Sequence, residues 1–181
     1  MQKSFIAYAL IRRDVIKDSG DALHHAKRAI FSMHRGEMWE AEVKLKEIEK
    51  NLKKLLTKYK NNTQILQEGS LREAFEEYVE ATLLYQYLTT GKIGEIKNLP
   101  IPDEVYLAGL CDVPGELLRY AISSATKKDI ETVAKCAEAS AEIVGALIEF
   151  ELTKYLRHKF DQAKDAMRKI EYVVYEVSLR H

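Results

Sequence analysis

The sequence contains few residues of the kinds that break or cross-link a chain. Its 181 residues include only 3 prolines, 8 glycines and 2 cysteines. Long helices with few turns are therefore expected. The two cysteines, Cys111 and Cys136, lie far apart in apolar surroundings, and the sequence has no Cys-x-x-Cys or Cys/His zinc spacing. We interpret them as reduced core thiols of an intracellular protein.

The chain also lacks a net charge and a long apolar run. Its 28 basic and 28 acidic residues cancel, so the formal net charge is zero. A nucleic-acid-binding protein of this composition would need a local basic patch, because no overall positive field exists. The apolar start, residues 1–11, is followed directly by Arg12 and Arg13. It is too short to span a bilayer and has no small-residue cleavage site, which predicts a cytoplasmic protein without a membrane segment.

Helical periodicity is present from one end of the chain to the other. Apolar residues recur with a period of 3.6, and no strand pattern competes with it. A hydrophobic content of 46% over 181 residues is enough for one domain with a sizeable core. We therefore predict an all-α fold, a single-domain bundle over residues 1–181 with about six to seven long helices.

The expected helices can be placed approximately from this periodicity and from turn residues. They cover residues 3–34, 70–89, 103–124 and 156–179, with a second helix that follows Gly36 and ends near residue 60 and a fifth that begins at residue 126 and ends between residues 150 and 154. Gly36 is expected to separate the first two helices. Ser70 with Glu73 is expected to form a capping box at the start of the third. Residues 90–102 form the one long loop.

Two pairs of carboxylates stand at helical spacing. Glu77 and Glu80 are three residues apart, and Asp112 and Glu116 are four apart. Each pair therefore faces one way on its helix. If the two helices pack face to face, four carboxylates meet and repel one another unless a cation lies between them. The usual cation is Mg²⁺ or Mn²⁺, which prefers oxygen ligands, so metal-dependent phosphate chemistry is our hypothesis.

Each pair also has a structural explanation. Glu77 and Glu80 lie roughly opposite the apolar face of their helix, as a solvated acidic face would. Asp112 and Glu116 interrupt a helix that is apolar nearly all round, and a buried carboxylate must be paired, neutral or bound to a metal. An ion pair with Arg119, or with a basic residue from another helix, is therefore an open alternative.

Pro114 separates Asp112 from Glu116. A proline inside a helix removes a backbone donor and clashes with the preceding turn, so the helix is expected to bend. Gly115 adds local freedom to the same turn. Backbone strain of this kind often marks a functional site. A tight helix crossing is the alternative explanation.

Four segments, in order along the chain, together resemble the translin family. They are residues 27–35 (KRAIFSMHR), 76–81 (EEYVEA), 112–119 (DVPGELLR) and 159–176, which begins KFD. The resemblance covers essentially the whole chain and is closest to the catalytic branch, translin-associated factor X. It implies an all-α fold of about seven helices. It also implies hollow oligomers, commonly octamers, that bind RNA and single-stranded DNA.

The resemblance further implies an activity. The catalytic branch is an Mg²⁺-dependent endoribonuclease, and its four metal-site acids correspond here to Glu77, Glu80, Asp112 and Glu116. All four are acids in this sequence, which argues against a protein that only binds. The implied cofactor is Mg²⁺ (or Mn²⁺). Because the C-terminal helix is similar to that of translin itself, the expected assembly is a homo-octamer that needs no second subunit.

RNA would have to be held by local positive charge. His24, Arg28 and Arg35 fall on one helix face by their spacing. With the family resemblance, the predicted nucleic-acid-binding residues are Lys27, Arg28, His34 and Arg35. The last helices offer a second basic group: Arg157, His158, Lys159, Lys164 and Arg168. An ordinary solvated charge or an ion pair within the bundle is the alternative for each.

Two other functions compete with the endoribonuclease. All-α nucleoside triphosphate pyrophosphohydrolases also use a Glu-x-x-Glu helix and Mg²⁺, but they need Glu-x-x-Asp on the next helix. Here Asp112 and Glu116 have a spacing of four instead, which disfavours that class. The second alternative is a non-catalytic, translin-type oligomer that binds RNA or single-stranded DNA, with the four acids serving as structural ion pairs.

Overall fold

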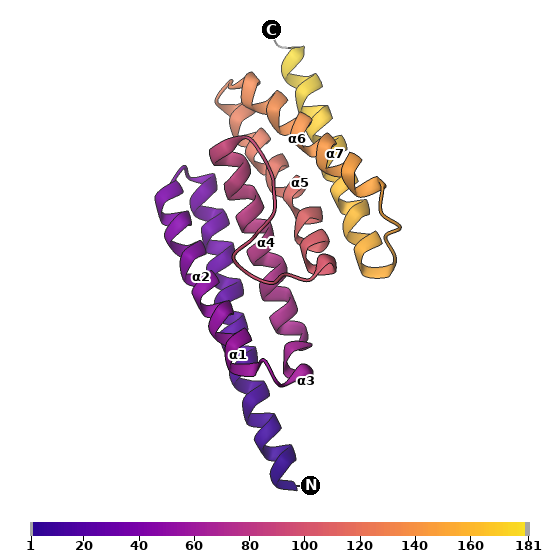
Figure 1. Ribbon diagram of the computed structural model, residues 1–181. Helices are drawn as coiled ribbons and strands as arrows, with labels where there is room; N and C mark the ends of the chain where they lie inside the picture. Colours follow the sequence, from indigo (N-terminus) through magenta and orange to yellow (C-terminus); the bar gives the residue numbers. More distant parts are fainter. Residues whose placement is uncertain (1, 180–181) are drawn as a thin grey trace. The chain divides into compact units, whose positions relative to one another are not determined.

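The computed structural model describes residues 2–179, with side chains described for residue 6 and residues 8–179. All regular elements in that range are helices (Figure 1). They are α1 (Gln2–His34), α2 (Met38–Tyr59), α3 (Thr63–Leu66), α4 (Gly69–Thr90), α5 (Asp103–Thr126), α6 (Ile130–Ile148) and α7 (Lys154–Ser178). The predicted all-α fold is confirmed. Six of the helices are long, and the seventh, α3, is a single turn.

Backbone contacts divide the chain into two compact units. Unit 1, residues 1–105, contains α1 to α4, the loop over residues 91–102 and the first three residues of α5. Unit 2, residues 106–181, contains the rest of α5 with α6 and α7. A single domain over the whole chain stays a prediction. Between residues 2 and 179, no helix combines the length and apolarity needed to cross a membrane.

In unit 1, α1 packs along both α2 and α4, and α2 also contacts α4 (Figure 1). The fully buried large side chains of this unit form its core: Val15, Met33, Ile48, Leu52, Ile65, Leu71, Val79, Leu83 and Leu84. Gly36, with φ of +79°, makes the turn between α1 and α2. Gly91, with φ of +70°, caps α4 by donating its N–H to the carbonyl of Tyr87. Both positions need the left-handed conformation that glycine adopts without strain.

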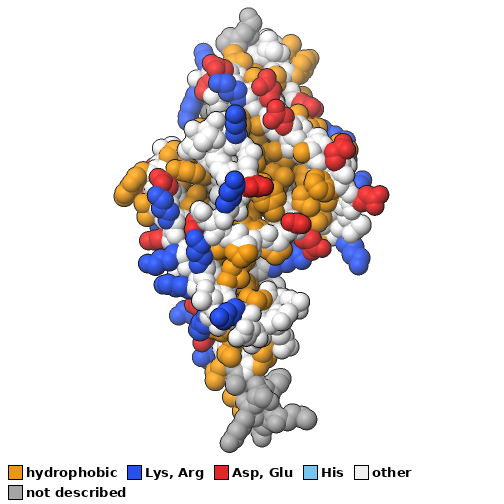
Figure 2. Space-filling model, in the orientation of Figure 1, with side chains coloured by type: hydrophobic (Ala, Val, Ile, Leu, Met, Phe, Trp, Pro, Cys, Tyr) orange, Lys and Arg blue, Asp and Glu red, His pale blue; other side chains and the backbone are white. Residues whose placement is uncertain are grey.

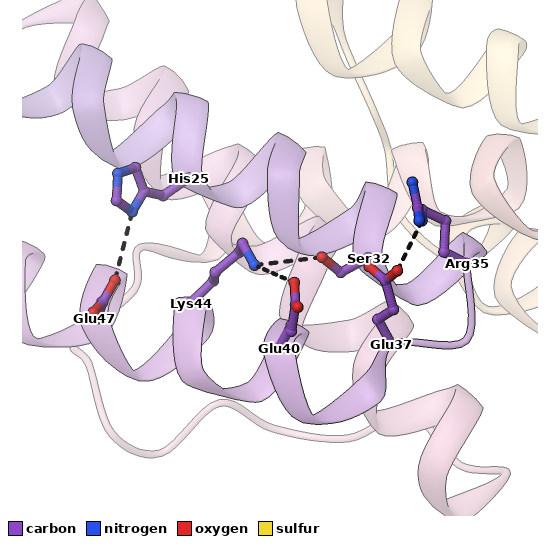
Figure 3. A network of polar contacts seen from close by, with 7 residues as sticks. All are labelled: His25, Ser32, Arg35, Glu37, Glu40, Lys44 and Glu47. Carbon is purple, nitrogen blue, oxygen red and sulfur yellow. Dashed lines mark hydrogen bonds and ion pairs between the residues drawn. The ribbon is translucent and has the colours of Figure 1, made fainter.

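A polar network joins α1 to α2 at their connected end (Figure 3). The Nζ of Lys44 lies 3.4 Å from the buried hydroxyl of Ser32 on α1 and 3.2 Å from Glu40 on its own helix. Arg35 donates from Nε to Glu37 across the turn at 2.8 Å. These bonds tie the start of α2 to the end of α1, so the side chains at this end of the hairpin keep a defined arrangement.

In unit 2, α6 packs against α7. The side chain of Asp129 caps α6 by accepting the backbone N–H of Thr132 at 3.1 Å. Leu117, Val133, Ile143, Leu147, Phe160 and Ile170 are among its buried apolar residues. The helix α5 continues through Pro114, which is itself buried.

The predicted capping box at Ser70 was wrong. The helix α4 begins at Gly69, and its N-cap residue is Glu68, which makes no side-chain cap hydrogen bond. The backbone N–H groups of Leu71 and Arg72 bond to the carbonyl of Glu68, so the first turn starts before Ser70. The carboxylate of Glu68 is instead bound by Nε of Arg12 at 2.7 Å.

Both cysteines are buried, free thiols, as predicted. Burial, with a smaller contribution from the charge of Asp112, raises the pKa of Cys111 to about 12. Burial, assisted by Asp129, raises the pKa of Cys136 to about 11. A raised pKa means that almost no thiolate, the reactive form, exists near neutral pH.

We therefore expect the folded protein to leave an added disulfide reagent unreacted near neutral pH. Both thiols should react at once when urea unfolds the chain, which a colorimetric thiol titration would measure. Rapid reaction of one thiol in the folded protein would contradict the burial of that cysteine.

Candidate functional site

Glu77 and Glu80 lie one turn apart on α4, in unit 1. The Oε1 of Glu77 is 3.3 Å from the Nζ of Lys27, which extends from α1. Glu80 is only 8% exposed. A carboxylate that is this far removed from water must be paired, neutral or bound to a cation. The interpretation of these residues as a solvated acidic face was therefore wrong for Glu80, and Glu77 is only partly exposed.

A third carboxylate on the same helix, Glu76, was missed by sequence reasoning. It is buried, and its Oε1 accepts from Nε of Arg72 at 2.9 Å. The same arginine lies 3.5 Å from Glu104. The sequence signal for this pair is the spacing of four between Arg72 and Glu76, which suits an ion pair along a helix. Glu76 therefore has a structural explanation that does not involve a metal.

Asp112 and Glu116 lie on one face of α5, in unit 2, and each is paired with a cation. The Oδ2 of Asp112 is bound by the Nζ of Lys159 from α7. Both carboxylate oxygens of Glu116 accept from Nη1 of Arg119, at 2.9 and 3.2 Å. The ion pairs left open as alternatives are therefore present, one on the same helix and one with another helix.

The surroundings of Lys159 raise its pKa, so its side chain stays positively charged. Burial by itself would lower its pKa, but the hydrogen bond to Asp112 and the negative charge of that residue raise the pKa above its ordinary value. Tyr155 acts in the same direction, and the Nζ also lies 5.4 Å from the centre of its ring. Lys159 thus supplies a permanent positive charge to Asp112. This assignment differs from the sequence analysis, which grouped Lys159 with the basic residues available to RNA.

The donor chemistry of the four predicted residues fits a hard divalent cation. All four are carboxylates, the ligands that Mg²⁺ and Mn²⁺ prefer. Lys27, Lys159 and Arg119 balance the charge of three of them. Among the residues with described positions, no group of three or more His, Cys, Asp or Glu side chains forms a ready-made metal site. The four-carboxylate grouping stays a prediction.

The predicted nucleic-acid-binding residues all lie near the end of α1. Arg28 is exposed, and among the described residues it makes no ion pair. Lys27 forms an ion pair with Glu77. His34 is half-buried in the last turn. Arg35 pairs with Glu37 and also places its guanidinium carbon 5.8 Å from the centre of the Phe31 ring.

Comparison with known proteins gives a consistent picture. The family model described as Translin family matches residues 11–181. An uncharacterized protein of Methanocaldococcus jannaschii is 28% identical over 166 residues, covering 88% of this chain and 72% of its own length. A protein of Schizosaccharomyces pombe named translin-associated protein X homolog is 22% identical over 188 residues, covering 93% of this chain and 81% of its own.

Solved structures with the same fold include C3PO proteins. The crystal structure of apo-NeC3PO has a TM-score of 0.89 at 23% identity and covers 97% of this chain and 94% of its own. The structure of AfC3PO in complex with duplex RNA has a TM-score of 0.87 at 22% identity, with coverage of 99% and 95%. At these identities the likeness establishes the fold and nothing about chemistry.

Proposed function

Because the chain belongs to the translin family, we propose that it binds RNA or single-stranded DNA as a homo-oligomer and cleaves RNA in an Mg²⁺-dependent reaction. The observation that carries the catalytic part is the arrangement of the acids. Glu77 and Glu80 share one face of α4, and Asp112 and Glu116 share one face of α5. The expected assembly is a homo-octamer, and the expected location is the cytoplasm.

The binding part of the proposal rests on similarity and on local charge. AfC3PO, which has the same fold, was solved with duplex RNA. On this chain, Arg28 is exposed near the end of α1 and Arg35 is exposed directly after it, although the whole chain carries no net charge. Contacts between such residues and phosphates give affinity that does not depend on sequence and that falls with salt.

We propose Glu77, Glu80, Asp112 and Glu116 as the ligands of Mg²⁺ (or Mn²⁺). A bound ion of this type supplies Lewis-acid stabilisation of phosphate oxygens and activation of water. In this proposal the cationic neighbours have a structural role. Lys159 holds Asp112, and Arg119 holds Glu116 through two hydrogen bonds, so both carboxylates are restrained in position and balanced in charge.

A non-catalytic oligomer that binds nucleic acid is the second candidate, and the same ion pairs favour it. Lys27, Lys159 and Arg119 compensate three of the four acids with side chains alone. Acids paired in this way could serve the stability of the fold without any role in cleavage.

Incubation of the protein with a labelled single-stranded RNA, with Mg²⁺ or with EDTA, separates these candidates. We expect cleavage with Mg²⁺ only, and retention of the RNA in a gel shift under both conditions. Retention without cleavage under either condition would support the non-catalytic oligomer. Failure to retain any nucleic acid would contradict both candidates.

Arg28→Ala is expected to weaken RNA binding about two- to fivefold, because one exposed phosphate contact is lost. The slope of log affinity against log salt should become shallower by about 0.7, the value for one phosphate contact with a single strand. Fluorescence anisotropy across a salt series measures both quantities. Arg13→Ala is the matched control, since Arg13 is exposed on the same helix. Equal effects of the two substitutions would contradict a specific role for Arg28.

A further inference from the structure

Trp39 is the most exposed large hydrophobic side chain in the described part of the chain. It is 75% exposed at the start of α2, and it is the only tryptophan of the protein. Burial of an indole against another surface stabilises a complex, because the ring has a large apolar area. An exposed tryptophan lacks this stabilisation. Tryptophan is enriched among the residues that contribute most to binding at protein surfaces.

A second exposed aromatic residue lies at the same end of the hairpin. Phe31, in the last turns of α1, is 56% exposed. Arg28, three residues before it, shares its face of the helix, and Arg35 follows directly after the helix ends at His34. The guanidinium of Arg35 already lies over the Phe31 ring, 5.8 Å from its centre. In Figure 2, hydrophobic side chains gather at the left edge, over the end of the α1–α2 hairpin.

The exposed face of α2 continues from Trp39 as a line of lysines. Trp39, Val43, Lys46, Lys50 and Lys54 recur at intervals of three or four residues, so they lie along one stripe. Four residues correspond to about 6 Å along the helix axis. Lys46 pairs with Glu42, whereas Lys50 and Lys54 make no ion pair within the described residues.

The charge is unbalanced in the second half of α2, whereas four glutamates accompany the lysines of its first half. Residues 50–60 contain five lysines and no acidic residue, in a chain whose total charge is zero. Lysine and arginine side chains are visible down the left edge of Figure 2, where Figure 1 places α2. Lys46, Lys50, Lys53, Lys54 and Lys58 lie together with Glu49 on this open face. The surface therefore offers an exposed indole at one end and positive charge toward the other.

These two properties indicate which kind of molecule the surface binds. The lysines favour a polyanion over an apolar protein surface. The exposed indole favours a polyanion that carries free aromatic faces, which an unpaired nucleic-acid strand has and a duplex hides within its stack. Base-to-aromatic stacking combined with a positively charged groove is the general way in which proteins hold single strands without sequence preference.

We propose that the exposed face of α2 defined by Trp39, Lys50 and Lys54, called here the hairpin face, binds an unpaired RNA or DNA strand. A base stacks on Trp39, and phosphates contact Lys50 and Lys54. This inference rests on the proposed binding of nucleic acid and narrows it to unpaired strands at one surface.

The single tryptophan gives a direct test, because its emission reports on this face alone. Binding of a labelled single-stranded RNA is followed by anisotropy while the emission of Trp39 is recorded. We expect the emission to be quenched in proportion to the RNA bound. An abasic strand with the same number of phosphates, and the corresponding duplex, should leave the emission unchanged at concentrations where anisotropy shows them bound.

Substitutions separate stacking from general binding. Trp39→Leu is expected to weaken single-strand binding about tenfold, which corresponds to about 1.4 kcal/mol. Trp39→Phe keeps a stacking ring and should retain most of the affinity. Phe150→Leu is the control, because Phe150 is also an exposed aromatic residue but belongs to unit 2 and not to α2. Circular dichroism would verify that each variant is folded.

Three results would overturn the inference. If RNA binds with unchanged Trp39 emission and Trp39→Leu binds as tightly as the wild type, the hairpin face is not the binding surface, while nucleic-acid binding itself stands. If Trp39 is shielded from a soluble quencher before RNA is added, and dilution exposes it, a second copy of the chain covers the face. If neither strand binds the wild type, the proposed function fails as well.

Discussion

Glu116→Gln is expected to lower Mg²⁺-dependent RNA cleavage by about 100-fold or more, the scale seen when charge stabilisation at a reaction centre is lost. Glutamine has nearly the same size and can still accept a hydrogen bond from Arg119, so the local packing of α5 should survive. What is lost is the negative charge that a divalent cation requires from its ligands. Initial rates over a range of Mg²⁺ concentrations measure the effect.

The matched control for this substitution is Glu138→Gln. Glu138 is exposed on α6, and the change removes the same charge from the same unit. It should leave cleavage unchanged, and both variants should retain RNA in a gel shift like the wild type. Cleavage by Glu116→Gln at the wild-type rate would remove Glu116 from the proposed site, and the activity would then have to be traced to another group or to a contaminant.

The ion pair between Asp112 and Lys159 is compatible with both candidate functions. Lys159 is held positive by Asp112, and Asp112 is in turn restrained by a side chain from a different helix. In the catalytic proposal this lysine orients a metal ligand, whereas in the binding-only proposal it simply neutralises a half-buried acid. The geometry is the same in both cases, which is why cleavage must be measured rather than inferred from the pairing.

Most helix positions could be predicted because long amphipathic helices repeat their pattern many times. The ends of α1 and α2 agree with expectation to about one residue, aided by Gly36. The one-turn helix α3 was missed, since its four residues are too few to show periodicity. The start of α4 was misplaced because Ser70 and Glu73 have the spacing of a capping box, while the backbone begins the helix at Gly69.

The candidate site was less predictable than the helices. The spacing of Glu77 to Glu80 and of Asp112 to Glu116 places each pair on one helix face, because that depends on local geometry alone. The burial of Glu80 and the ion-pair partner of Asp112 depend on tertiary packing. Lys159 is 47 residues from Asp112 in the sequence, and nothing local connects them. Local spacing did suggest the Arg119 partner of Glu116, which is three residues away.

Leu147→Ala is expected to destabilise the protein by about 2–5 kcal/mol, because it removes a large side chain from a packed interior and leaves a cavity. Leu147, on α6, is only 1% exposed and belongs to the core of unit 2. The apparent melting temperature should fall by about 2–4 °C for each kcal/mol lost. Thermal unfolding followed by circular dichroism measures this shift.

The neighbouring residue provides the control, because adjacent residues on a helix point about 100° apart and can differ strongly in burial. Ile148 is 61% exposed, although it has the same number of side-chain atoms as Leu147. Ile148→Ala should therefore change the free energy of unfolding by no more than about 0.5 kcal/mol, as is usual for surface positions. A large effect at Ile148 with a small one at Leu147 would mean that α6 presents the opposite face to the core. Equal, large effects would mean that the exposed face of α6 is buried against another copy of the chain.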